Sequence, residues 1–159
     1  MAVRFIRKGE DPVLRTVAHP VKKISPVIHR LLDDMLDTLR YSDNGLALAA
    51  PQIGISKRLI VIEFGEKIFQ LINPRVVESS SETEVAVEGC LSFPDVWGEV
   101  ERAQRVVVEA QDRDGEPVTL EAEGILARAL QHEIDHLDGV LFIDKVIRFV
   151  EFDDEESEE

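Results

Sequence analysis

The chain has 159 residues, 44% of them hydrophobic and 31% charged, which fits one globular domain with its own core and excludes disorder as the main state. Acidic residues number 32 against 18 Lys and Arg, so the formal net charge is −14. Because an acidic surface repels phosphate, direct nucleic-acid recognition is not expected as the main function.

Three features of the chain predict its compartment. Its single cysteine, Cys90, allows no intrachain disulfide and fits a reducing environment. Residues 1–8 carry charges with no apolar stretch behind them, unlike a secretory signal. No apolar run approaches the ~18 residues that are needed to span a bilayer. We therefore expect a cytoplasmic protein with no membrane partner.

The first predicted element is a helix over residues 25–40. Ser25 suits the N-cap and Pro26 suits the first helical position. An apolar stripe then recurs at helical spacing, made by Val27, Ile28, Leu31, Leu32, Met35, Leu36 and Leu39. The run Asp43-Asn44-Gly45 breaks this pattern.

Short strands are predicted for the middle of the chain. The candidates are residues 59–63, 67–72, 75–78, 84–87, 106–111 and 117–122. Gly65 marks a turn, Asn73-Pro74 is expected to end the second candidate, and residues 112–115 read as a hairpin turn. A second helix over residues 123–137 follows and is stopped by Asp138-Gly139. This order of elements predicts an α+β domain.

The second helix carries a chemical motif. Residues 131–136 read Gln-His-Glu-Ile-Asp-His and contain the pattern His-Glu-x-x-His. Helical positions four apart lie within about 40° of each other, so His132 and His136 project side by side and can bind one metal ion. Glu133 is placed to act on a metal-bound water. On this motif alone, a polar helix surface that matches by chance remains an alternative.

The two faces of this helix differ. Leu126, Leu130, Ile134 and Leu137 cluster on the face away from the histidines, and we expect them in the core. Ile125 and Ala129 fall on the histidine side and can line an apolar pocket beside the metal. The helix is therefore expected to lie at the centre of the domain, surrounded by short antiparallel or mixed strands.

A catalytic metal site needs a third protein ligand, and no histidine follows His136. Upstream lies Cys90, whose thiolate is a strong ligand for such metals. Taken alone, Cys90 would more often be a buried, inert side chain.

Three motifs together resemble those of the peptide deformylases, in family order and with family-like spacing. They are Glu88-Gly89-Cys90-Leu91-Ser92, the histidine motif extended to Gly139, and Gly45-Leu46-Ala47-Leu48-Ala49-Ala50-Pro51-Gln52. The resemblance covers residues 5 to 143 and implies a metal-dependent hydrolase. Such an enzyme removes the formyl group from the N-terminal formyl-methionine of new polypeptides and releases formate.

The resemblance also implies the roles of particular residues. Cys90, His132 and His136 would bind one divalent metal ion, Fe²⁺ in the cell, with Zn²⁺, Ni²⁺ or Co²⁺ able to replace it. Glu133 would be the general acid and base. The Gln52 side chain and the Leu91 backbone N–H would stabilise the oxyanion.

Substrate, partners and organisation follow from the same resemblance. Gly45, Leu46, Ile125 and Ala129 would contact the substrate. The partners would be N-formyl-methionyl nascent polypeptides and, transiently, the ribosome. Residues 1–150 would form one catalytic domain, and residues 151–159 an acidic tail that is not a ribosome anchor.

Other positions carry narrower expectations. Ala47 replaces a family glycine, and we expect extended backbone there, with a neutral packing change as the alternative. Trp97 is either an apolar wall for substrate or a partly buried surface aromatic. Glu88 and Arg102 are expected to form a buried ion pair. Asp135 is expected to face Arg128 on the helix exterior instead of supporting the ligands.

Two rival functions stay open from the residues alone. A general zinc endopeptidase would account for His-Glu-x-x-His but not for Cys90 and Gln52 in their motifs. A protein that merely holds metal or attends the ribosome would need neither Glu133 nor Gln52.

Overall fold

The computed structural model describes residues 2–42 and 45–151. In chain order, the elements are η1 (Pro12–Arg15), α1 (Pro26–Tyr41), β1 (Ala47–Ala49), η2 (Ala50–Ile53), β2 (Leu59–Phe64), β3 (Lys67–Ser79), β4 (Thr83–Cys90), β5 (Phe93–Ala103), β6 (Arg105–Gln111), β7 (Pro117–Glu123), α2 (Gly124–Leu137), η3 (Phe142–Asp144) and β8 (Val146–Val150). The predicted α+β class is confirmed. Among the described residues, no helix is long and apolar enough to cross a membrane.

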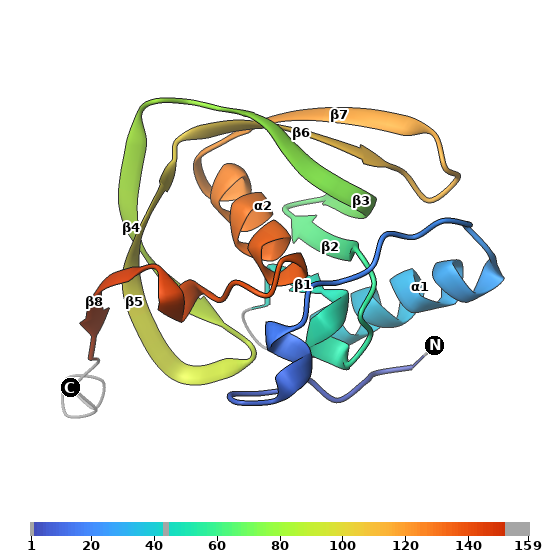
Figure 1. The fold of residues 1–159 in the computed structure, drawn as a ribbon, viewed down its shortest axis with the longest axis horizontal. Helices are drawn as coiled ribbons and strands as arrows, with labels where there is room; N and C mark the ends of the chain where they lie inside the picture. Colours follow the sequence, from blue (N-terminus) through green and yellow to red (C-terminus); the bar gives the residue numbers. More distant parts are fainter. Residues whose placement is uncertain (1, 43–44, 152–159) are drawn as a thin grey trace.

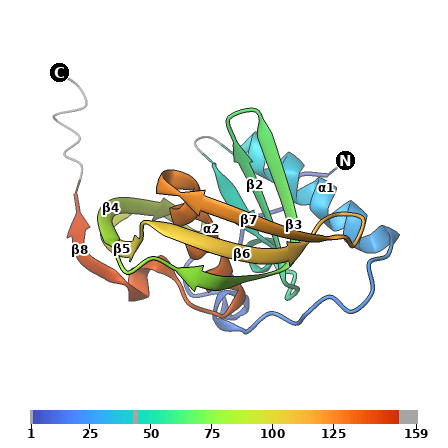
Figure 2. The same ribbon diagram turned by 90° about the horizontal axis from the view of Figure 1, so that it is seen from above.

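The strands form two antiparallel sheets around α2. The larger has the order β1-β2-β3-β6-β7 and the smaller the order β4-β5-β8. Helix α2 lies in the middle of the molecule, with β3, β6 and β7 crossing above it and β4 and β5 at its side (Figure 1). Seen from above, α1 lies at the opposite flank from β8 (Figure 2).

Strand β2 is apolar on both faces because it lies between the two helices. Ile60 and Ile62 pack in the cluster that contains Leu130 of α2, whereas Leu59 and Val61 pack with α1. Successive residues of a strand point to opposite faces, so both faces of β2 are buried. This arrangement fixes β1, β2 and the η2 turn firmly beside α2.

Several boundaries differ from the predictions. Ser25 is the N-cap of α1, but its side chain makes no capping hydrogen bond. The two strands predicted around Asn73 are one strand, β3, which continues through an irregular register between Ile72 and Arg75. Asn73 adopts φ 53° there, and its amide exchanges two 2.8 Å hydrogen bonds with the backbone of Val21. Such side-chain bonding lets asparagine hold a left-handed conformation without ending the strand.

Three observed strands, β1, β5 and β8, were not predicted. Proline and glycine inside Phe93–Ala103 hide the alternation that would reveal β5. The hairpin turn at residues 112–115 is confirmed, with Gly115 at φ 86°. Asp43 and Asn44, and all of the acidic tail after Glu151, lie outside the described residues.

Candidate active site

The three predicted ligand residues meet at one point. His132 and His136 lie one turn apart on α2, and Cys90 ends β4. One potential ligand atom from each lies within 4.8 Å of the others. The Cys90 Sγ lies 3.3 Å from Nε2 of His136. Ligands bound at ~2.1 and ~2.3 Å in a tetrahedral site lie about 3.6 Å apart, so this spacing fits one shared metal ion.

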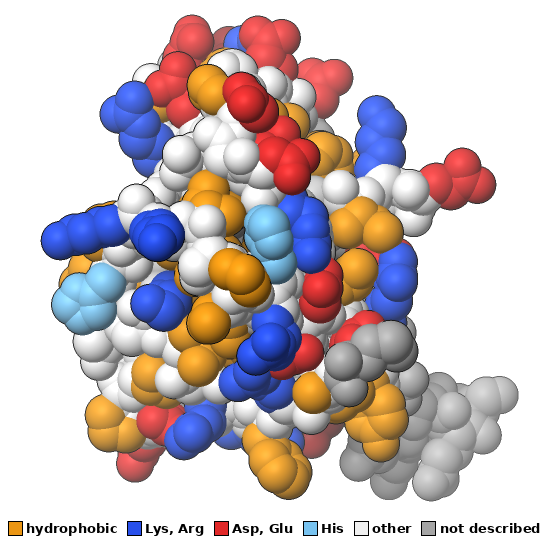
Figure 3. Space-filling model, turned by 90° about the vertical axis from the view of Figure 1, so that its right-hand side faces the viewer, with side chains coloured by type: hydrophobic (Ala, Val, Ile, Leu, Met, Phe, Trp, Pro, Cys, Tyr) orange, Lys and Arg blue, Asp and Glu red, His pale blue; other side chains and the backbone are white. Residues whose placement is uncertain are grey.

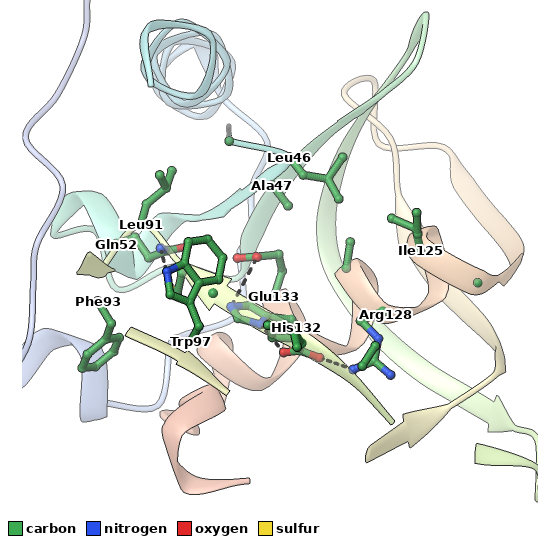
Figure 4. Close-up of a pocket in the computed structure, with 18 of the residues that line it drawn as sticks. Leu46, Ala47, Gln52, Leu91, Phe93, Trp97, Ile125, Arg128, His132 and Glu133 are labelled. Carbon is green, nitrogen blue, oxygen red and sulfur yellow. Dashed lines mark hydrogen bonds and ion pairs between the residues drawn. The ribbon is translucent and has the colours of Figure 1, made fainter. Parts of the chain in front are cut away.

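Glu133 lies beside this cluster and is 5% exposed. Its Oε2 is 3.9 Å from Nε2 of His132, and its Oε1 has no hydrogen-bond partner among the described residues. Burial raises the pKa of this carboxyl to about 7. A carboxyl with such a pKa can take up and release a proton near neutral pH. Figure 4 shows Glu133 and His132 with Trp97 on one side and Ile125 and Arg128 on the other.

Gln52 approaches the cluster from η2. Its Nε2 lies 3.5 Å from the Cys90 Sγ and 3.2 Å from Ser92 Oγ. Leu91 follows Cys90 directly and lines the same pocket. A side-chain amide and a backbone segment thus converge beside the thiol, where an oxyanion would need donors.

Glu88 orients His132 through a hydrogen bond to its Nδ1, the ring nitrogen that lies away from the ligand cluster. Its Oε1 accepts hydrogen bonds from Nδ1 of His132 at 2.8 Å and from Nη2 of Arg102 at 2.9 Å. Its Oε2 accepts two more, from Nε of Arg102 and from Nη1 of Arg128, both at 2.6 Å. The predicted buried pair of Glu88 and Arg102 is confirmed. Because a carboxylate only accepts, Nδ1 of His132 is protonated, and Nε2 is the nitrogen through which this ring would bind a metal.

The expectation for Asp135 is wrong. Its Oδ2 binds Arg102 Nη1 at 2.8 Å and Lys145 Nζ at 2.9 Å, not Arg128. Arg128 instead turns towards Glu88 and the backbone oxygens of Glu84 and Val100. Helical spacing places Asp135 near Arg128, but the folded β4–β5 hairpin supplies better partners for both charges.

The electrostatics of the cluster suit a cation. Burial lowers the pKa of His132, but the negative charge of Glu133 and hydrogen bonds to Cys90 and Glu88 outweigh it and raise this pKa to about 10. Burial keeps the pKa of His136 well below its usual value. Because an imidazole binds a metal ion only in its neutral form, binding a metal ion here would displace a proton from His132.

A pocket of about 600 Å³ opens beside the cluster. All four predicted substrate residues, Gly45, Leu46, Ile125 and Ala129, line it. Ile125 is 64% exposed and therefore forms the rim, whereas Ala129 is buried. In Figure 4, Leu46 and Ala47 lie on the opposite side of the pocket from α2.

Ala47 and Trp97 shape the mouth of this pocket. Ala47 is in strand β1, paired with Ile62, so the expected extended backbone is confirmed. Trp97 lines the pocket, and its ring lies so close to Gly89 that a Cβ added there would meet it at 2.3 Å. A side chain at position 89 would therefore displace the Trp97 ring.

Sequence reasoning missed Ser92 and Arg128 as neighbours of the site. Ser92 belongs to the cysteine motif, and Arg128 lies one helical turn before His132. These positions could have indicated that both residues lie near the site. Their partners come from distant segments, and no spacing rule reveals such pairings.

The site combines two imidazoles, a thiol and a buried carboxyl group with a pKa near neutrality, all beside an open pocket. This combination is typical of a metal-dependent hydrolase. The chain belongs to the polypeptide deformylase family, whose sequence profile matches residues 3–151. Members of this family are enzymes that remove the N-formyl group from nascent peptides.

Individual relatives agree with this assignment. The chain is 58% identical over 150 residues to the peptide deformylase of Caldicellulosiruptor bescii, covering 94% of this chain and 89% of that one. It resembles the crystal structure of peptide deformylase from Thermotoga maritima with a TM-score of 0.89 and 46% identity, covering 92% and 99% of the two chains. A peptide deformylase from Acinetobacter baumannii was solved with Met-Ala-Ser bound. It matches this chain with a TM-score of 0.87 and 36% identity, over 91% of this chain and 100% of that one.

Proposed function

We propose that this chain deformylates N-formyl-methionyl polypeptides with one divalent metal ion held by Cys90, His132 and His136. The observation that carries this proposal is the convergence of their ligand atoms within 4.8 Å, beside the buried Glu133. When bound, the metal ion would polarise the formyl carbonyl and lower the pKa of water.

The protein's own groups then supply the proton transfers and the oxyanion donors. Glu133 takes a proton from the attacking water and returns it to the amine that leaves. Nε2 of Gln52 and the backbone N–H of Leu91 donate to the carbonyl oxygen as it becomes negative, and one such donor is worth about 3 kcal/mol. Formate and a free N-terminal amine result.

The methionine side chain occupies the pocket between β1 and α2. Leu46, Ile125 and Ala129 offer it an apolar surface, and the backbone of Gly45 lies at the edge of the same pocket. The tripeptide in the Acinetobacter baumannii relative begins with methionine, as this assignment requires.

The test is formate release from formyl-Met-Ala-Ser, with acetyl-Met-Ala-Ser and a longer unblocked peptide as controls. We expect release from the formyl peptide alone. Cleavage of the unblocked peptide at internal bonds would instead indicate an endopeptidase. Metal binding without any turnover would indicate a protein that only holds metal.

We propose that the enzyme works in the cytoplasm, where nascent chains emerge, and that it uses Fe²⁺ there. The ligand set suits several divalent metals, so metal content must be measured on protein purified without oxygen. The ferrous form is expected to lose activity in air, since both iron and a thiolate oxidise, whereas a Zn²⁺- or Ni²⁺-loaded form should lose it more slowly.

Ribosome contact is proposed to be transient and independent of the acidic tail. On the face in Figure 3, Lys and Arg side chains lie among acidic and hydrophobic ones instead of forming one continuous basic surface. The formal net charge of −14 also disfavours strong attachment to RNA.

Deleting residues 153–159 is expected to leave turnover on a short formyl-Met peptide unchanged. Co-sedimentation with ribosomes should be equal or stronger, most clearly at low salt, because the deletion removes negative charge. A salt series with the full chain as control makes the comparison. Loss of co-sedimentation on deletion would show that the tail recruits the enzyme.

A further inference from the structure

We infer that Ser92 is a positioning residue that fixes the amide of Gln52 for oxyanion binding. The inference rests on the proposed function of Gln52. It concerns a side chain that touches neither the ligand cluster nor the pocket, since Ser92 is 0% exposed and does not line the pocket.

The orientation of the Gln52 amide is set by its hydrogen-bond partners. The backbone N–H of Ala49 donates to Oε1 of Gln52 at 2.9 Å. Because a backbone N–H can only donate, the oxygen of the amide must face Ala49, and Nε2 must face the other way. Nε2 consequently points towards Ser92 and Cys90.

Ser92 uses one of the two hydrogens on Nε2. Its Oγ accepts from Nε2 at 3.2 Å, which leaves the second hydrogen directed at the Cys90 Sγ, 3.5 Å away, and at the space beside it. The terminal torsion of glutamine is broad when nothing restrains it. Two bonds, one to each end of the amide, therefore hold its plane before substrate arrives.

The backbones of both residues are tied to the same N-terminal segment. The N–H of Arg7 donates to the carbonyl of Gln52 at 2.7 Å, and the N–H of Gly9 donates to the carbonyl of Ser92 at 2.9 Å. Residues 7–9 thus bridge η2 and the turn that follows Cys90. The two side chains meet from segments 40 residues apart in sequence because this bridge holds their backbones together.

The test is a double-mutant cycle on the metal-loaded enzyme. Gln52→Ala should lower kcat by about 10²- to 10³-fold, as loss of an oxyanion donor does. Ser92→Ala should lower kcat by about fivefold to tenfold with little change in KM, the loss expected for one neutral hydrogen bond. In the Gln52→Ala background, Ser92→Ala should have no further effect, because the group on which it acts is gone.

Controls separate positioning from a structural role. Ser56→Ala removes another buried hydroxyl, one with no hydrogen-bond partner among the described residues, and should leave kcat unchanged in both backgrounds. Ser92→Cys leaves no cavity, since its side chain is slightly larger, but it is a weak acceptor, so it should reproduce the loss of kcat seen in Ser92→Ala. Metal content and the midpoint of thermal unfolding are measured for every variant.

Two results would overturn the inference, and they are distinguishable. If Ser92→Ala lowers kcat equally with and without Gln52, Ser92 acts through the fold and not through the amide. If Gln52→Ala itself leaves kcat unchanged, the proposed role of Gln52 fails and Ser92 has nothing to position.

Discussion

Replacing Glu133 with Ala should lower kcat by about 10³-fold or more while metal binding stays near normal, since general acid–base catalysis contributes up to about 10⁴-fold. Glu133 lies beside the ligand cluster, but its carboxylate is not among the three ligand groups that converge. Its removal should therefore eliminate the proton transfers and leave the donor set intact.

The measurement pairs turnover with elemental analysis of the same sample. Glu133→Gln keeps the shape and removes the base, so it should be nearly as inactive. Glu121→Ala, on an exposed carboxylate of β7, serves as the control and should behave like the unaltered enzyme. Near-normal turnover in metal-replete Glu133→Ala would disprove the assignment.

Stability provides a second readout for Glu133. Burial penalises its charged form, so its removal is not expected to destabilise the fold as loss of a well-satisfied buried charge would. Unchanged or higher thermal stability, together with lost turnover, would mark a residue kept for chemistry and not for folding.

Replacing Cys90 with Ser should weaken metal binding by at least about 100-fold, because a neutral hydroxyl is a poor ligand and even altered support of a ligand costs tenfold to 100-fold. Turnover should fall in parallel, since the loaded fraction falls. The change is nearly isosteric, so the pocket and α2 should keep their structure.

Competition with a chelator gives the metal affinity of Cys90→Ser. Cys90→Asp is the matched comparison, because it restores a negative ligand and should recover part of the affinity. Full occupancy of Cys90→Ser after dialysis, measured by elemental analysis, would remove Cys90 from the site.

Local patterns in the sequence predicted the two helices and the side-by-side placement of the two histidines. Helical periodicity located α1 and α2 within one residue of their observed starts and ends. The side-by-side placement of His132 and His136 follows from helix geometry alone. Cys90 joined them only through the resemblance of its motif, since no local rule links residues 42 positions apart.

The remaining side-chain contacts of the site could not be predicted, because they join residues that are far apart in the sequence. The partners of Asp135 could not be read from its helix, because Arg102 and Lys145 reach it from β5 and from the segment after η3. The same holds for the bond between Gln52 and Ser92, which lie 40 positions apart. Charged and polar side chains bind whichever partners lie near them in the folded protein. The sequence gives only the distance between residues along the chain, so it does not show which partners these are.

The three segments that meet at the pocket, residues 45–52, 88–92 and 124–136, have a consequence for synthesis. A chain that grows from its N-terminus completes the second of these segments only at residue 92 and the third only near its end. No product that stops before residue 136 holds both imidazoles. Termination before residue 136 therefore yields inert fragments and not weakened enzymes.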